Sequence, residues 1–154
     1  MSTPSYPEEY LNLIAQGRSV MLSTLNTEGI TQCSYAPVVH TSPTEFFILI
    51  SDLASHTAYI KSAARVGILF IEDEKTCENI FRRRRASLSC DVIAIDRSST
   101  TFKLISQSFR SRHGDTVDII LKLADFHLFK LTAYRIRLIT GFGQAKDLEI
   151  PNLV

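Results

Sequence analysis

Apolar and polar residues alternate along much of this chain, and the period of the alternation predicts an antiparallel sheet. Alternation with period two, short apolar runs and flanking turn residues predict strands at residues 19–25, 30–39, 45–50, 66–72, 85–96 and 126–140. The turn residues at 26–29 and 41–44 predict hairpins between the first three strands. Gly141-Phe142-Gly143 then turns the chain into a short tail.

Spacings of three and four residues predict helices at the start of the chain and between the strands. The first begins at Pro7 and ends at Gly17. The others cover residues 56–64 behind a Ser55 cap, residues 98–112, and a segment behind an Asp115 cap in which Val117, Ile120, Leu121 and Ala124 face the core. Strands joined mostly by hairpins, with interposed helices, predict an α+β domain built on a small antiparallel barrel.

The two longest predicted strands each combine a polar and an apolar face. In residues 85–96, Arg85, Ser87 and Ser89 share the polar face. In residues 126–140 an interruption is expected near Thr132, and beyond it Tyr134 shares the apolar face with Ile136.

Composition and charge limit the classes of function. The chain has 154 residues, 45% hydrophobic and 21% charged, which predicts one globular domain over residues 1–154. No run approaches the roughly 18 apolar residues of a membrane span, and the N-terminus lacks the pattern of a signal peptide, so a cytoplasmic protein without membrane contact is expected. A net charge of +1 gives no general attraction for nucleic acid.

The three cysteines and four histidines show no metal-binding pattern. Cys33, Cys77 and Cys90 cannot all pair and form no C-x-x-C motif, so reduced thiols are expected. The histidines have no metal-ligand spacing with one another or with cysteine. His127 follows Phe126 in a predicted strand, where a packed or surface role is more usual than ligation.

A candidate anion site lies where the third strand ends and a helix begins. Backbone N–H groups at a helix N-terminus favour negative charge, and Ser51, Ser55, His56 and Thr57 add donors there. A phosphate or carboxylate fits this pattern. An ordinary capped helix after a strand is the alternative.

The run from Arg82 to Arg85 is the second candidate site. Alternation predicts that Arg83 and Arg85 share one face, where they can hold an anionic ligand, and that Arg82 and Arg84 share the other. A solvated charge run paired with the acidic residues at 72–78 is the alternative. Nucleic-acid binding is not expected, because no aromatic residues interleave with the arginines.

Together these segments resemble the FMN-binding split barrel of the pyridoxamine 5′-phosphate oxidase superfamily, and especially its heme-utilisation branch of HugZ/HutZ type. The resemblance covers about residues 19–148. It rests on Ser34-Tyr35-Ala36-Pro37, on residues 49–57, on residues 69–74, on the arginine run, and on residues 125–129 with Gly141-Phe142-Gly143. It implies a split β-barrel, an antiparallel Greek-key barrel with flanking helices.

The resemblance implies cofactor-binding roles for residues of both candidate sites. In the flavin oxidases the strand that matches Ser34, Tyr35, Ala36 and Pro37 runs along the flavin. Ser51 and the His56-Thr57 pair match positions that hold the FMN phosphate, and Arg85 matches a polar position that reaches the flavin. Those oxidases carry basic residues where this chain has Ser34 and His56-Thr57. In the heme branch, heme lies at a homodimer interface, which gives Arg83 and Arg85 a propionate-binding role. That branch ligates iron through a histidine near its C-terminus. No histidine follows His127 here, so His127 is a weak candidate.

Three functions follow as hypotheses. The first is a homodimeric heme-utilisation protein that degrades heme as a heme oxygenase. The second is an FMN-dependent oxidoreductase on the same fold. The third is a heme- or flavin-binding protein without catalytic activity, because fold similarity alone does not establish an activity.

Overall fold

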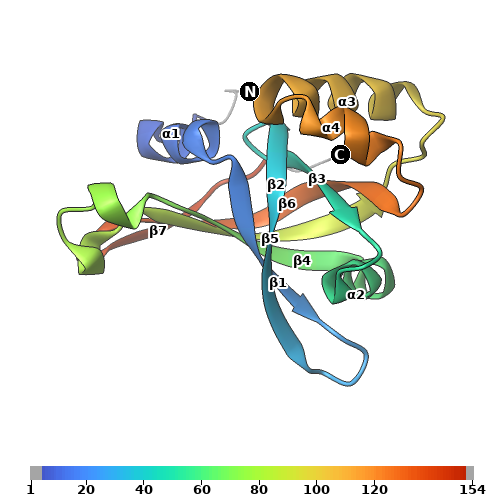
Figure 1. Cartoon of the computed structure of the whole chain (residues 1–154). Coiled ribbons are helices and arrows are strands. Elements are labelled where there is room, and N and C mark those ends of the chain that lie inside the picture. The colour runs from blue at the N-terminus through green and yellow to red at the C-terminus, as the bar shows by residue number, and fades with distance from the viewer. Residues whose placement is uncertain (1–4, 152–154) are drawn as a thin grey trace.

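A closed antiparallel barrel is the centre of the structure, a computed structural model that describes residues 5–151 (Figure 1). Neighbouring strands follow the order β3-β2-β1-β4-β5-β6-β7, and pairing of β3 with β6 closes the first six into a barrel. The strands are β1 Ser19–Leu25, β2 Thr31–Ser42, β3 Glu45–Ser51, β4 Arg65–Ile71, β5 Arg85–Ala94, β6 Phe126–Gly141 and β7 Gln144–Leu148. The predicted α+β barrel is confirmed.

Helices lie around the barrel rather than inside it (Figure 1). The α-helices are α1 Glu8–Gln16, α2 Ser55–Ala63, α3 Thr100–His113 and α4 Thr116–Leu121, and two short 3₁₀ turns, η1 Glu74–Thr76 and η2 Ile80–Arg82, connect β4 to β5. Within residues 5–151, no helix combines the length and the hydropathy that crossing a membrane requires.

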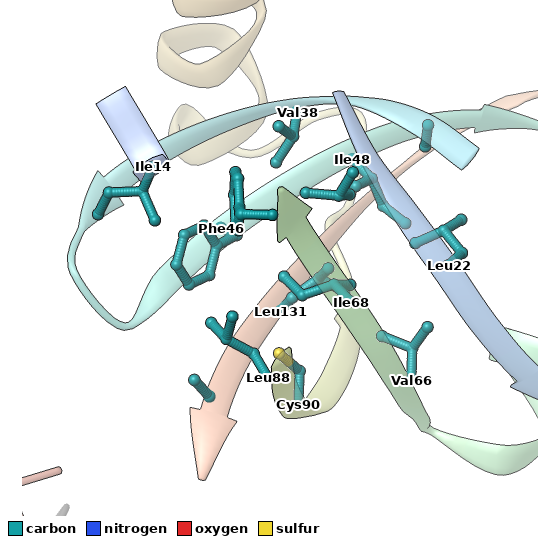
Figure 2. Close-up of a cluster of buried hydrophobic side chains, with 14 of the residues drawn as sticks. Ile14, Leu22, Val38, Phe46, Ile48, Val66, Ile68, Leu88, Cys90 and Leu131 are labelled. Atoms are coloured by element: carbon teal, nitrogen blue, oxygen red, sulfur yellow. The ribbon is translucent and has the colours of Figure 1, made fainter. Parts of the chain in front are cut away.

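Two hydrophobic cores hold these layers together. Inward-facing residues of the barrel strands and α1 form the first, including Ile14, Phe46, Leu88 and Leu131 (Figure 2). The second lies outside the barrel, where α3 and α4 pack on β2, β3 and β6. The five central residues of β3 are buried because this strand contributes to both cores. The outward-facing residues of β1, Ser19, Met21, Ser23 and Leu25, are all exposed, so no such helical layer covers this face within residues 5–151.

β6 contains a β-bulge at Tyr134, in its ladder with β5. Ser89 pairs with Arg135 but Cys90 pairs with Ala133, so Tyr134 is an extra residue in the ladder. Phe129 and Ala133 face the barrel interior before the bulge, and Ile136 faces it afterwards. The predicted placement of Tyr134 beside Ile136 on the apolar face is therefore wrong. The Tyr134 ring lies outside, with the Arg65 guanidinium 5.2 Å from its centroid.

Several predicted boundaries also differ from the structure. Ala54, not Ser55, is the N-cap of α2, and Ser55 bonds across to β2 instead. Asp115 stands at the N-cap of α4 without a side-chain capping bond, and Ala124 is exposed because that helix already ends at Leu121. β5 ends at Ala94 rather than at residue 96, and the predicted tail contains β7.

Candidate functional site

The residues predicted to bind a cofactor lie on opposite faces of the barrel wall. β2 alternates, so Ser34 and Ala36 face inward while Tyr35 and Pro37 face outward. Ser51, Ser55, His56 and Thr57 lie at the β3–α2 junction, on the side of Ser34. Arg83 and Arg85 lie at the start of β5, on the side of Tyr35. The structure therefore divides these residues into two candidate sites.

An inner cluster of Gln32, Ser34, Ser55 and His56 joins β2 to the first turn of α2. Ser55 Oγ lies 2.7 Å from Gln32 Nε2 and 3.0 Å from Gln32 Oε1. His56 Nδ1 lies 2.7 Å from Ser34 Oγ. Through these contacts, side chains of β2 and α2 hydrogen-bond directly to one another.

His56 is the most buried member of the inner cluster. His56 is only 7% exposed, and its buried Nε2 atom has no hydrogen-bond partner within residues 5–151. Burial lowers the pKa of His56 because the cationic form loses its hydration. The ring is therefore neutral near pH 7 and offers an anion no charge.

The hydroxyl groups of Ser51 and Thr57 bond within the β3–α2 turn. Thr57, 1% exposed, donates from Oγ1 to the Ser51 carbonyl at 2.6 Å. Ser51 Oγ donates to Asp125 Oδ2 at 2.8 Å and accepts from the Leu53 N–H at 3.1 Å. Both hydroxyls thus satisfy groups of the chain itself, which fixes the turn. This segment therefore fits an ordinary helix start after a strand better than it fits the predicted anion site.

The outer face of the barrel carries an exposed apolar row. Tyr35 on β2 pairs with Met21 on β1, and Met21 pairs with Leu69 on β4, so their side chains are neighbours on one face. Tyr35 is 64% and Met21 54% exposed, which is unusual for large side chains in a row. The next row, with Cys33, Ser23 and Gly67, contains only small residues.

A groove adjoins this row, between α1, the start of β1, the end of β4 and η1. We call it the β1–β4 groove. It encloses about 1040 Å³. Met21, Leu69 and Ile71 line it with apolar surface, and Arg18, Arg83 and Arg84 are among its charged residues. Arg85 lies beside it, because it pairs with Ile71. The groove thus combines an apolar floor with guanidinium groups and with the carboxylates of Glu9, Glu72, Asp73 and Glu74.

The arginines do not alternate as predicted, because only Arg85 belongs to β5. Arg82 ends η2, where its guanidinium lies 4.8 Å from the centre of the Phe142 ring. Arg83 Nε donates to the Glu72 carbonyl at 2.7 Å, and Arg85 Nη1 donates to the Arg83 carbonyl at 2.7 Å. Arg83 and Arg85 nevertheless adjoin one another through this backbone contact, and their joint binding of an anion stays a prediction.

Acidic residues balance part of this charge. Arg84 Nη2 lies 3.2 Å from Glu72 Oε2, and Arg83 Nη1 lies 3.9 Å from Glu74 Oε2. Burial acts to raise the pKa of Glu72, but its hydrogen bonds and charge contact with Arg84 outweigh burial and lower that pKa overall. The predicted pairing with acidic neighbours is therefore present for Arg83 and Arg84, while the side chain of Arg85 forms no ion pair within residues 5–151.

His127 lies apart from the arginines. It pairs with Ile50 near the start of β6, whereas Arg85 pairs with Ile139, about 40 Å farther along the strand at roughly 3.3 Å per residue. Its Nε2 lies 2.8 Å from Asp52 Oδ2, and Lys61 Nζ lies 2.9 Å from Asp52 Oδ1. The hydrogen bond from His127 is the largest cause that lowers the pKa of Asp52, and Lys61 adds to it.

Several residues of these sites were absent from the sequence prediction. Met21 carried a signal, since it is an apolar residue at an outward position of an alternating strand. Arg18, which lines the groove from the start of β1, and Gln32, which bonds Ser55, had none. Their positions depend on contacts between distant segments.

The sequence model of the pyridoxamine 5′-phosphate oxidase family matches residues 6–140. This chain belongs to that family. The match covers the barrel, both candidate sites and all four α-helices. The predicted resemblance to the superfamily is thereby confirmed.

Relatives within the family lie on the heme-utilisation side. The chain is 30% identical over 137 residues to the heme oxygenase HutZ of Vibrio cholerae, covering 89% of this chain and 77% of HutZ. A crystal structure of HutZ, which names the protein as the heme storage protein of Vibrio cholerae, superposes on this chain with a TM-score of 0.79. The two sequences are 27% identical, and the superposition covers 86% of this chain and 92% of the HutZ chain.

A second structural relative is ChuZ of Campylobacter jejuni. Its TM-score is 0.85 at 33% identity, over 94% of this chain and 59% of ChuZ. This chain therefore spans little more than half of the ChuZ structure. The two relatives confirm the predicted split-barrel fold and the predicted HugZ/HutZ-type branch.

Proposed function

We propose that this family member is a homodimeric heme protein that binds heme beside the β1–β4 groove and degrades it oxidatively. The observation that carries the proposal is the outer surface on which Met21, Leu69 and Ile71 adjoin Arg83 and Arg85. Its relative HutZ is named a heme oxygenase. The pairing of an apolar floor with guanidinium groups suits a flat apolar ring that carries carboxylates.

Each group on this surface has a distinct binding role in the proposal. The apolar row from Tyr35 to Leu69 supports the porphyrin plane by burial of apolar surface. Arg83 and Arg85 bind propionates by charge-assisted hydrogen bonds. Bound heme supplies the iron at which dioxygen is activated, while the protein contributes the pocket and its electrostatics.

FMN is the second candidate, since the family as a whole is one of oxidases named for a phosphorylated substrate. A phosphate dianion at the α2 N-terminus needs cationic or free donors. There the inner cluster holds a neutral His56, and the Ser55 and Thr57 hydroxyls bond within the chain. The residues present therefore fit FMN phosphate poorly, which favours heme.

We further propose that two copies associate through the outer faces of β1, β2 and β4. Tyr35 and Met21 are large, exposed and adjacent there. The row of small residues beside them permits close approach of another sheet. The three free cysteines, Cys33, Cys77 and Cys90, support a reducing compartment, and we place the protein in the cytoplasm.

Absorption spectroscopy tests the proposal. Titration with heme should produce a saturable Soret band, and addition of FMN should produce no bound flavin after gel filtration. Ascorbate and oxygen should then bleach the Soret band and release iron with a linear tetrapyrrole. A stable Soret band under these conditions indicates a binder without catalytic activity, as in the name heme storage protein that HutZ also carries. Retained flavin without a Soret band contradicts the proposal.

A further inference from the structure

A second groove lies between the end of α1 and one face of α3, separate from the inner cluster and from the arginine run. We call it the α1–α3 groove. It is a shallow groove, open to solvent, with a volume of about 900 Å³. Its lining comprises Ala15, Gln16, Arg18, Leu104, Gln107, Ser108, Ser111 and Arg112. None of these side chains is acidic, and six are arginine, glutamine or serine side chains that can donate hydrogen bonds.

The charged side chains of α3 are all basic. This helix of 14 residues has no Asp or Glu and carries Lys103, Arg110, Arg112 and His113. Arg110 is ion-paired with Asp118 of α4, but Arg112 turns toward α1. Exposed helix faces usually mix both signs, so a face without carboxylates leaves a local positive potential.

Arg18 and Arg112 bring two guanidinium groups to the groove. Arg112 Nη2 donates to the Ala15 carbonyl at 2.6 Å and to the Gly17 carbonyl at 3.1 Å, which fixes its position at the end of α1. The Arg18 side chain is exposed and forms no hydrogen bond or ion pair within residues 5–151. Arg112 is therefore held by the fold, and Arg18 remains free to bind.

The positive charge at this groove also affects the pKa values of two nearby histidines, His113 and His40. Burial lowers the pKa of His113, the hydrogen bond with the Val38 carbonyl opposes this effect, and the charges of Arg18 and Arg112 lower the pKa further. Burial also lowers the pKa of His40, with a further contribution from Arg112. No carboxylate opposes these effects on either ring. An anion in the groove offsets the arginine charges and thus acts to raise both pKa values.

We propose that the α1–α3 groove binds the phosphate group of a small molecule, with Arg18 and Arg112 as the charged partners and Gln107 and Ser111 as neutral donors. A phosphate group carries between one and two negative charges at neutral pH and offers several acceptor oxygens. Two guanidiniums with several neutral donors match that need better than they match a single carboxylate. Gln16 and Arg18 line both grooves, whereas Gln107, Ser111 and Arg112 line only the α1–α3 groove, so substitutions of these three separate this site from the heme site.

The test is an NMR titration of the full chain with inorganic phosphate at constant ionic strength. Saturable shifts of the His113 ring signals are expected, with a higher pKa of His113 when phosphate is bound. Acetate should give no saturable shift. Glycerol phosphate is the second probe: tighter binding than inorganic phosphate assigns the groove to a phosphate ester, and equal binding assigns it to free phosphate.

Two variants locate the binding. Arg18→Gln and Ser111→Glu should each weaken phosphate binding about tenfold or more, because one removes a charge and the other adds a like charge. Thr101→Glu, with the same charge change at an exposed α3 position outside the groove, should bind like wild type. Absence of saturable shifts, equal binding of acetate, or equal effects of Ser111→Glu and Thr101→Glu would overturn the proposal. Ser111→Glu should leave the heme titration unchanged.

Discussion

The ring of His56 hydrogen-bonds the Ser34 hydroxyl at 2.7 Å, and this contact joins α2 to β2. Burial lowers the pKa of His56, so the unfolded chain takes up this proton at a higher pH than the folded protein does. The free energy of unfolding is therefore greatest above about pH 6.5, where the unfolded imidazole is neutral, and falls as the pH is lowered from there.

His56→Gln should flatten this pH dependence. One histidine contributes at most about 1.4 kcal/mol per pH unit to the slope, and the variant should remove part of the slope between about pH 6.5 and 5. Urea unfolding at a series of pH values measures it. His40 and His113, whose pKa values are also lowered, retain the remaining dependence. An unchanged slope in His56→Gln would show that the pKa of His56 is the same in the folded and unfolded states.

The double variant Arg83→Ala with Arg85→Ala should weaken heme binding about 10- to 100-fold, as expected for the loss of one or two charge-assisted hydrogen bonds. Titration at the Soret band measures the dissociation constant. Arg65→Ala is the control, since Arg65 is exposed and its Nε bonds Asp91 at 3.1 Å outside the groove. If the double variant binds like Arg65→Ala, the two arginines are not in the site.

His127→Ala should leave the Soret band unchanged. His127 bonds Asp52 and lies near the opposite end of β6 from the partner of Arg85. Loss of the His127 hydrogen bond should instead raise the pKa of Asp52 toward its ordinary value, which NMR of the carboxyl group measures. Disappearance of the Soret band would identify His127 as the iron ligand.

Two neighbouring tyrosines should respond differently to loss of their hydroxyl groups. Tyr10 is fully buried and donates to the Pro43 carbonyl at 2.5 Å, so Tyr10→Phe should lower the free energy of unfolding by about 1 kcal/mol. The buried Tyr6 hydroxyl has no partner within residues 5–151, so Tyr6→Phe should be neutral or stabilising. Chemical denaturation compares them, and equal effects would contradict this assignment.

Local patterns in the sequence were sufficient to predict the barrel strands, because alternation and turn residues act over a few positions. The exposed Met21 was detectable in the same way, as an apolar residue on an outward face. The inner cluster was not, since the pairing of Ser34 with His56 joins residues 22 positions apart in the sequence. Arg82 also departed from the strand pattern because η2 ends with it before β5 begins.

The anion site predicted at the α2 N-terminus illustrates the same limit. Residue types with hydroxyl and imidazole groups indicate donors, but their availability depends on what else they contact. Ser51 is engaged by Asp125, which follows it by 74 positions. Such competition between a ligand and the chain itself becomes visible only in three dimensions.

The extra residue at Tyr134 interrupts the alternation of β6 without exchanging its two faces. Ala133 and Ile136 both point inward on either side of the bulge, and Arg135 and Arg137 stand opposite Ser89 and Ser87 on the outer wall. A chain lacking Tyr134 would keep this pairing as a regular ladder, with both guanidiniums still outside. Loss of this one codon would therefore straighten the strand and leave its inner and outer faces unchanged.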